Sequence, residues 1–310
     1  MALNYAEVWS PDLLEIMEQE SLTSPFVTTA VKWLSAKTFH FTQMSTSGYK
    51  SHSRLGGWNK GTFAQTDVPF TLTHDRDISF LVDKIDVDET NETASIKNIS
   101  EVFHKTQQIP EMDAYFYSKV ATEAQKLDGY HSSTALSSYT KENVYGKLKA
   151  MLSAGKLRRY VAKGALIAYV NSTIMDLLEQ STDFTRKIEM TQIAEGGIGI
   201  ETRITDIDGV TLIEVIDDER FYDKFDFTDG FAPVASTSHK INVLIASPLT
   251  VKTVPKISSI YYFVPGSHTE GDGYLYQDRS LSDTFVFPNG KDNKIDSIYV
   301  DVDTATYTAE

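Results

Sequence analysis

The sequence predicts an α+β fold in which one block of helices and strands is inserted between two parts of another domain. Strand-like runs divided by turn residues occur both before residue 82 and after residue 241. The block between about 130 and 240 instead alternates helical and strand-like segments. Hydrophobic residues make up 41% and charged residues 23% of the 310 residues, a composition typical of a packed globular chain.

Residues 1–36 are expected to form an arm with one short helix. Ser10 can cap this helix, and Pro11 suits its first position. Pro25 closes the region.

A long hairpin is expected next. Residues 38–46 and 63–82 read as extended because apolar and polar side chains alternate along them. The stretch between them, SGYKSHSRLGGWNKG at 47–61, is rich in glycine and would form the tip. The hairpin is too polar to form a core of its own, so it should lie against another part of the protein.

Two helices are predicted between residues 92 and 126. The first, 92–107, has apolar residues at helical spacing. The second, 110–126, begins with Pro110, has acidic residues in its first turn and ends near Lys126, as the helix dipole favours. Its expected buried face is Met112, Phe116, Val120, Ala124 and Leu127.

The middle block is expected to contain a helix at 143–154, a buried strand at 165–170 and a helix at 172–180 capped by Asn171. Asp208-Gly209 between two apolar runs is the strongest hairpin signal in the chain.

After residue 241 the sequence returns to strands. INVLIAS reads as a strand, and SPLTVKTVPK reads as a short helix or turn. SIYYFVP, GYLYQDRSL, DTFVFP and IDSIYVDVD read as further strands, separated by glycine and Pro-Asn-Gly turns.

Charge is distributed unevenly along the chain. The formal net charge is −14, yet the 46 residues from Ser21 to Thr66 contain no Asp or Glu. Five of the 29 basic residues lie there, which leaves 24 basic against 43 acidic residues in the remainder. Such a chain can bind nucleic acid through its basic part, or bind another copy of itself.

The tip at 47–61 therefore has three interpretations. Its basic and aromatic residues could grip single-stranded nucleic acid, although the charge is small for a chain this acidic. It could be an exposed loop without a role. We favour a flexible arm that docks on an acidic partner. The subunit-contact residues expected on this interpretation are Lys50, Arg54, Trp58 and Lys60.

No other motif indicates chemistry. The chain has no cysteine, so thiolate sites are excluded. The glycine-rich run at 195–199 matches no phosphate loop, and the acidic residues at 206–208 and 217–219 lack calcium-loop spacing. The histidines lack zinc spacing, and no nucleophile elbow appears. We expect no catalytic residue, no cofactor, no metal and no membrane segment.

Four stretches, in their order along the chain, resemble the major capsid proteins of tailed phages. They are the Pro-Glu-x-Asp-Ala helix start at 110–114, KLRRYVAKGALIAYV from Lys156, IASPLTVKTVPKI from Ile245 and GYLYQDRSLSDTFVFPNGK from Gly273. The chain looks like the capsid subunit of a siphophage that infects Gram-positive bacteria, with the Hong Kong 97 phage fold.

This resemblance implies a particular division of the chain. Residues 1–37 would be the N-terminal arm and 38–75 the extended hairpin loop. Residues 76–129 and 241–310 would form the peripheral domain, with a long spine helix. Residues 130–240 would form the inserted axial domain.

The resemblance also implies a function that is structural rather than enzymatic. Hexamers and pentamers would form an icosahedral shell around phage double-stranded DNA, without binding the DNA specifically. Because the chain starts almost at the arm, a separate scaffolding protein is expected, together with a portal. The protein would be made and assembled in the host bacterial cytoplasm and end in the virion. An encapsulin-like cargo shell shares the fold and stays open as an alternative, as does covalent cross-linking through Lys50 or Lys60.

Overall fold

The computed structural model describes residues 21–29, 37–52, 56–84, 96–181, 188–191, 202–289 and 294–308. The helix expected after Ser10 lies outside these residues.

The described elements fall into four sheets and a set of helices. In chain order they are η1 (Ser24–Phe26), β1 (Thr38–Thr46), β2 (Phe63–Thr71), β3 (His74–Asp83), α3 (Ile96–Phe103), η2 (His104–Gln108), α4 (Ile109–Gln125), β4 (His131–Ser133), η3 (Leu136–Ser138), α5 (Val144–Leu152), α6 (Arg158–Val161), β5 (Ile167–Asn171), α7 (Ser172–Glu179), β6 (Ile188–Thr191), β7 (Thr202–Ile207), β8 (Val210–Val215), η4 (Asp218–Arg220), β9 (Phe225–Asp226), β10 (Ala232–Pro233), β11 (His239–Ala246), β12 (Val251–Phe263), β13 (Gly273–Val286) and β14 (Ile298–Thr306).

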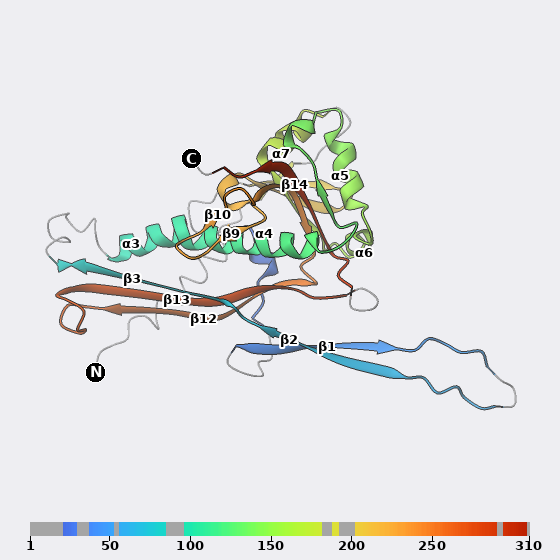
Figure 1. Cartoon of the computed structure of the whole chain (residues 1–310), viewed down its shortest axis with the longest axis horizontal. Coiled ribbons are helices and arrows are strands. Elements are labelled where there is room, and N and C mark those ends of the chain that lie inside the picture. The colour runs from blue at the N-terminus through green and yellow to red at the C-terminus, as the bar shows by residue number, and fades with distance from the viewer. Residues whose placement is uncertain are drawn as a thin grey trace.

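The elements form an elongated body with a projecting hairpin (Figure 1). A long helix built from α3, η2 and α4 lies over the three-stranded sheet β12-β13-β3. The β1–β2 hairpin lies below this sheet and projects to the right in Figure 1, away from the end of the sheet that α3 covers. The seven-stranded sheet, with α5, α6 and α7, lies above the other end of the long helix.

The seven-stranded sheet has the order β4-β14-β11-β5-β8-β7-β6, and its central strands are buried on both faces. On β5, Ala168 and Val170 belong to a core cluster that includes residues of α5 and α7. Tyr169 between them points to the opposite face, into a second cluster with Phe116 and Val120 of α4. This alternation explains why the strand reads as a continuous apolar run.

Two local predictions in this sheet are confirmed. Asn171 caps α7, with its side-chain oxygen accepting a hydrogen bond from Thr173 N at 2.9 Å. Asp208 and Gly209 both have positive φ, 53° and 80°, as a type I′ turn between β7 and β8 requires.

The two predicted helices are one continuous helix, so the expected break before Pro110 is wrong. Pro110 has no N–H to donate to the carbonyl of Thr106. The chain absorbs this loss in a π turn at η2, where Ile109 N–H bonds the carbonyl of His104. Gln108 and Ile109 keep right-handed helical dihedrals. The buried surface of α4 is also wider than the expected stripe, because the helix contacts sheets on two sides.

The prediction of a helix or turn for SPLTVKTVPK is also wrong, because only residues 247–250 form a turn and β12 begins at Val251. Pro255 is accommodated because β12 is an edge strand of its sheet, and its register with β13 shifts between Pro255 and Ile257. β13 runs through what the sequence suggested were two shorter strands, and β12 runs from the predicted helix or turn into the predicted strand SIYYFVP.

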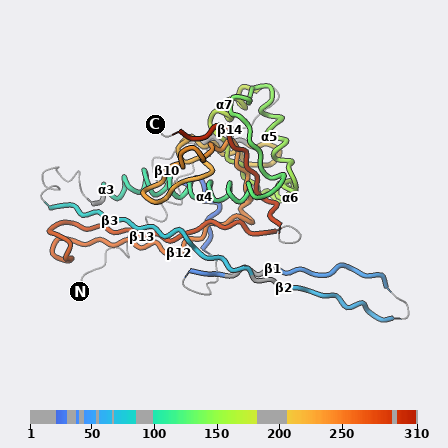
Figure 2. The backbone as a smooth tube through the Cα atoms, in the orientation of Figure 1, coloured from blue at the N-terminus to red at the C-terminus, as the bar shows by residue number. Residues whose placement is uncertain are grey.

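Strands from after residue 241 are shared between two sheets. β11 and β14 join the seven-stranded sheet with strands of the middle block. β12 and β13 instead pair with each other and with β3. The path of the chain backbone (Figure 2) therefore passes between the two sheets more than once after residue 241.

A buried carboxylate on α4 ties distant segments together. Asp113 is fully buried and accepts hydrogen bonds from Ser21 Oγ at 2.5 Å and Thr23 Oγ1 at 2.7 Å. Arg220 of η4, itself buried, donates to Asp113 Oδ2 at 3.0 Å. The contact joins the segment around η1 and the η4 turn to the middle of the molecule.

Replacing Arg220 by Ala would leave the Asp113 carboxylate buried without its cation. We expect a loss of about 3–5 kcal/mol in the free energy of unfolding, the range for breaking a buried ion pair from one side. Urea unfolding of the full chain measures this loss. Arg158→Ala, at an exposed position, is the matched control and should change stability by less than about 0.5 kcal/mol. Equal effects of the two substitutions would contradict this role for Arg220.

Candidate functional site

The candidate site is the β1–β2 hairpin and its tip, residues 47–61. β1 and β2 pair antiparallel from Thr38↔Thr71 to Thr46↔Phe63, without a register shift. Ser47 N extends the pairing with a bond to Thr62 O at 2.8 Å. The expected hairpin is thus present, while β3, which follows it, pairs with β13 in a different sheet.

The tip is held by few bonds of its own. Asn59 Nδ2 donates to Ser51 O at 2.9 Å, which joins the two sides of the tip. Gly57 adopts a positive φ of 69°, a conformation that favours glycine. The remaining described tip residues have no regular secondary structure, so the two sides of the tip are joined mainly through one asparagine side chain.

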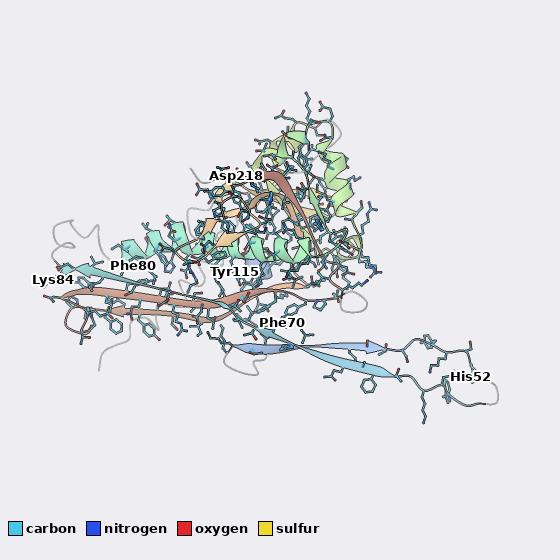
Figure 3. All side chains as sticks on the ribbon, in the orientation of Figure 1. His52, Phe70, Phe80, Lys84, Tyr115 and Asp218 are labelled. Atoms are coloured by element: carbon cyan, nitrogen blue, oxygen red, sulfur yellow. The ribbon has the colours of Figure 1, made fainter. Side chains whose placement is uncertain are left out.

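Three of the four expected contact residues are placed at this tip. Lys50 and Lys60 are exposed on its opposite sides, and Trp58 is 94% exposed. The ring of Trp58 lies 6.4 Å from that of His52, which Figure 3 shows near the far end of the hairpin. Arg54 lies outside the described residues. Lys50, Trp58 and Lys60 are therefore all available to a partner in the isolated chain.

Further exposed apolar side chains extend this surface along the strands. Tyr49 is fully exposed, Met44 is 67% exposed and Phe63 is 74% exposed. Because side chains alternate along a strand, the register puts Met44 and Phe63 on one face of the hairpin. Neither residue is among the contact residues expected from the sequence. The alternation of side chains along the strands could have identified them, because Met44 and Phe63 lie on the face of the hairpin opposite to Phe39.

The base of the hairpin is fixed by a cluster of four phenylalanines, Phe39, Phe70, Phe285 and Phe287. Phe39 is 2% exposed, and its ring lies 5.6 Å from that of Phe70 and 5.2 Å from that of Phe285. Phe70 also contacts Phe287, with ring centroids 5.0 Å apart. Figure 3 shows Phe70 below the three-stranded sheet. The expectation that the hairpin lies against another part of the protein is therefore confirmed for its base and wrong for its outer part, which projects from the body.

Polar contacts reinforce this base. Thr73, which follows β2, donates through its N–H and its hydroxyl to Asp283 Oδ2 of β13, at 2.9 and 2.8 Å. Asp75 pairs with Arg279 at 2.9 Å and with Lys37 at 3.0 Å. Hydrogen bonds from Arg279 and Lys37 lower the pKa of Asp75 to about 2, so these pairs persist through the neutral and mildly acidic range.

Other kinds of site have little support among the described residues. Within them, no group of three or more His, Cys, Asp or Glu side chains is arranged to hold a metal ion. No helix in that part of the chain is both long enough and apolar enough to cross a membrane. Asp206 and Asp217, part of the acidic groups noted in the sequence, accept backbone hydrogen bonds from Gly209 and Glu219.

Known structures share this architecture. The chain is similar to a subunit of the bacteriophage PhiM1 mature capsid, with a TM-score of 0.62, 13% identity and coverage of 93% of this chain and 88% of that one. It is similar to a chain of the cyanophage P-SCSP1u capsid, with a TM-score of 0.55, 10% identity and coverage of 90% and 86%. A chain of Mycobacterium phage Ogopogo matches with a TM-score of 0.56, 7% identity and coverage of 92% of each chain.

At the level of sequence, no family model matches the chain, and no curated protein matches it. The structural matches establish the fold, which is the expected α+β capsid fold of the Hong Kong 97 type.

The phenylalanine cluster should determine whether the hairpin stays attached to the sheet. Phe39→Ala removes a buried ring, and we expect a loss of about 3 kcal/mol in stability. Hydrogen exchange in residues 38–46 and 63–71 should accelerate. Phe63→Ala removes an exposed ring from the same hairpin and should leave both quantities nearly unchanged. Faster exchange in the Phe63→Ala chain, or unchanged exchange in the Phe39→Ala chain, would contradict the assignment.

Proposed function

We propose that this chain is the major capsid protein of a tailed bacteriophage, a siphophage of Gram-positive bacteria. Copies of it self-assemble as hexamers and pentamers into the icosahedral head that encloses double-stranded DNA. The observation that carries the proposal is the projecting hairpin on a capsid-type fold, with a tip whose described residues are exposed. A shell subunit needs surfaces of this kind, because multiple weak contacts close the shell.

In this proposal the hairpin tip docks on an adjacent copy. Lys50, Arg54 and Lys60 face carboxylates of the neighbour, and Trp58 supplies the apolar anchor. Charge supports a second copy as the partner, since the tip carries no acidic residue and the chain as a whole has a formal net charge of −14. The glycines let the tip adjust to neighbours in hexamers and pentamers, which meet at different angles.

The proposed domains follow the division expected from the sequence. Residues 1–37 are the arm, 38–75 the extended loop, 76–129 and 241–310 the peripheral domain, and 130–240 the axial domain. β11 and β14 run through the seven-stranded sheet, so the axial and peripheral parts share a hydrogen-bonded sheet. This continuity favours rigid coupling between the two parts.

The further partners in the proposal are a separate scaffolding protein and a portal. The enclosed DNA is not bound specifically, and the chain has no enzymatic role. Synthesis and assembly take place in the host cytoplasm, and the mature location is the virion capsid.

A charge-reversal experiment tests the docking of the tip. The double variant Lys50→Glu, Lys60→Glu should fold normally and fail to form shells, because like charges would then face each other at the contact. Size-exclusion chromatography and negative-stain microscopy, with and without a scaffolding protein, measure assembly, and circular dichroism checks the fold. The matched control is Lys156→Glu with Lys163→Glu, two exposed lysines changed in the same way away from the hairpin.

The outcomes separate the two parts of the proposal. Normal shells from the Lys50→Glu, Lys60→Glu chain would contradict docking by charge while leaving the capsid role intact. A wild-type chain that stays monomeric in every condition would contradict the capsid role. Binding of single-stranded DNA with a steep dependence on salt, in that same monomer, would favour the nucleic-acid interpretation of the tip instead.

A further inference from the structure

A ring of four polar side chains, three buried and one half-buried, lies between the π turn of the long helix and the three-stranded sheet. His104 and Gln108 come from η2, and Tyr276 and Asp278 come from β13. His104 is 2% exposed, Tyr276 2% and Asp278 5%. The surroundings are apolar: Ile260 and Ile78 flank Asp278 in register, and Phe80 of β3, which Figure 3 shows between helix and sheet, flanks Tyr276.

Three of the four side chains are already linked. His104 Nε2 lies 2.9 Å from the hydroxyl of Tyr276, and His104 Nδ1 contacts Gln108 Oε1. Burial lowers the pKa of His104, which favours its neutral imidazole, and the ring described here has that form. The single ring hydrogen must then be on Nδ1, because Gln108 Oε1 can only accept. Nε2 in turn accepts from Tyr276, which uses the one hydrogen of that hydroxyl.

Asp278 is the place where the ring is open. Neither of its carboxyl oxygens has a hydrogen-bond partner among the described residues. Burial raises the pKa of this carboxyl to about 6, and the nearby Gln108 side chain lowers it by less than burial raises it. The Tyr276 hydroxyl, having donated to His104, offers Asp278 only lone pairs. A protonated Asp278 can donate to that oxygen, whereas an ionised Asp278 cannot.

We propose that a proton on Asp278 closes this ring and thereby holds the π turn of the helix against the sheet. In the closed ring Asp278 donates to Tyr276, Tyr276 to His104, His104 to Gln108, and the Gln108 amide to Asp278. Each member then donates once and accepts once. Loss of the proton removes one donor and leaves a buried charge beside an oxygen lone pair. π turns inside α-helices occur frequently at functional sites, and here the proton would determine how firmly the π turn is held.

Other titratable groups face the same layer. Arg76 of β3 is paired with Glu111 of α4 at 2.6 Å, and His74 of β3 lies 3.4 Å from Glu111. The remaining titratable groups on the helix side of the three strands are Tyr262, Tyr274 and Asp283, while Glu101 and Lys105 of the helix are exposed. His74 is the histidine among these groups and contacts Glu111, so it has its own control.

The direction of the pH effect follows from the two pKa values of Asp278. The pKa of Asp278 is about 6 in the folded chain, against an ordinary value of 3.8. Asp278 therefore binds its proton more tightly when the π turn is held against the sheet than when the π turn has opened. The stabilisation is complete below about pH 3.8 and is lost as the pH rises to about 6. Protonation of His104 has the opposite effect on stability. Because burial lowers the pKa of His104 in the folded chain, its protonation at acidic pH favours opening of the π turn. Comparison of variants separates these two effects.

Hydrogen exchange of the full chain between pH 4 and 7, corrected for intrinsic rates, tests the proposal at amides 104–109. The ratio of wild-type to Asp278→Asn protection should rise as the pH falls from 6 to 4, by up to about tenfold per pH unit, the limit for one linked proton. Asp77→Asn, an exposed change on the other face of β3, should give a ratio that does not depend on pH. The wild-type to Asp278→Asn ratio should be the same when both chains carry His74→Gln.

A second comparison distinguishes the ring from simple burial of a carboxyl group. In a Tyr276→Phe background, Asp278→Asn should no longer alter the pH dependence at residues 104–109, because the link to His104 is absent. The ring proposal is wrong if Asp278→Asn still alters the pH dependence in the Tyr276→Phe background. It is also wrong if the ratio of wild-type to Asp278→Asn protection, measured with Tyr276 present, does not depend on pH. If the Asp278→Asn chain does not fold, the protection of amides 104–109 in the Tyr276→Phe chain is compared with that in wild type instead. A ratio of these two protections that does not vary between pH 4 and 6 overturns the proposal.

Discussion

The structure depends on one helix that must be apolar on more than one side. α4 lies between the seven-stranded sheet and the three-stranded sheet, and it contributes to the packing of both. Phe116 and Val120 pack in the core cluster beneath the seven-stranded sheet. Tyr115 instead bonds Asp283 of β13, at 2.8 Å, on the side of the other sheet. Because both sheets depend on this helix, its position determines where the hairpin leaves the body.

Buried carboxylates in this acidic chain are satisfied mostly by neutral donors. Asp301 accepts from Thr134 at 2.7 Å, Tyr139 at 2.6 Å and Asn242 at 2.8 Å. Asp283 accepts from Thr73 and Tyr115. Such donors come from distant segments and have directional requirements, so each contact fixes the relative position of the segments that it joins. Asp278 is different, since it lacks any such donor among the described residues.

Features that depend on residues close together in the chain, such as turns and helix caps, could be predicted from the sequence. Features that depend on packing between distant segments could not. The Asp208-Gly209 turn, the Asn171 cap and the existence of the hairpin follow from local conformational preferences. The continuous helix through Pro110 and the strand through Pro255 do not, because packing against a sheet and an edge position override the preferences of proline. The exposure of Lys50, Trp58 and Lys60 follows from composition. The phenylalanine cluster that fixes the base of the hairpin does not follow from composition, since Phe285 and Phe287 lie more than 200 residues away in the chain.

The hairpin also has a mechanical consequence. Nine paired residues in each strand make a stiff rod about 30 Å long, at about 3.4 Å per residue. The rod is clamped at one end by Phe39 and Phe70 and free at the other. A load applied at the tip therefore acts on the clamp with a large lever arm. β13 provides part of the clamp through Phe285 and supports the long helix through Asp283 and Tyr115. β3 follows directly from the hairpin and is paired with the helix through Arg76 and Glu111, so torque on the rod would reach the helix through both strands.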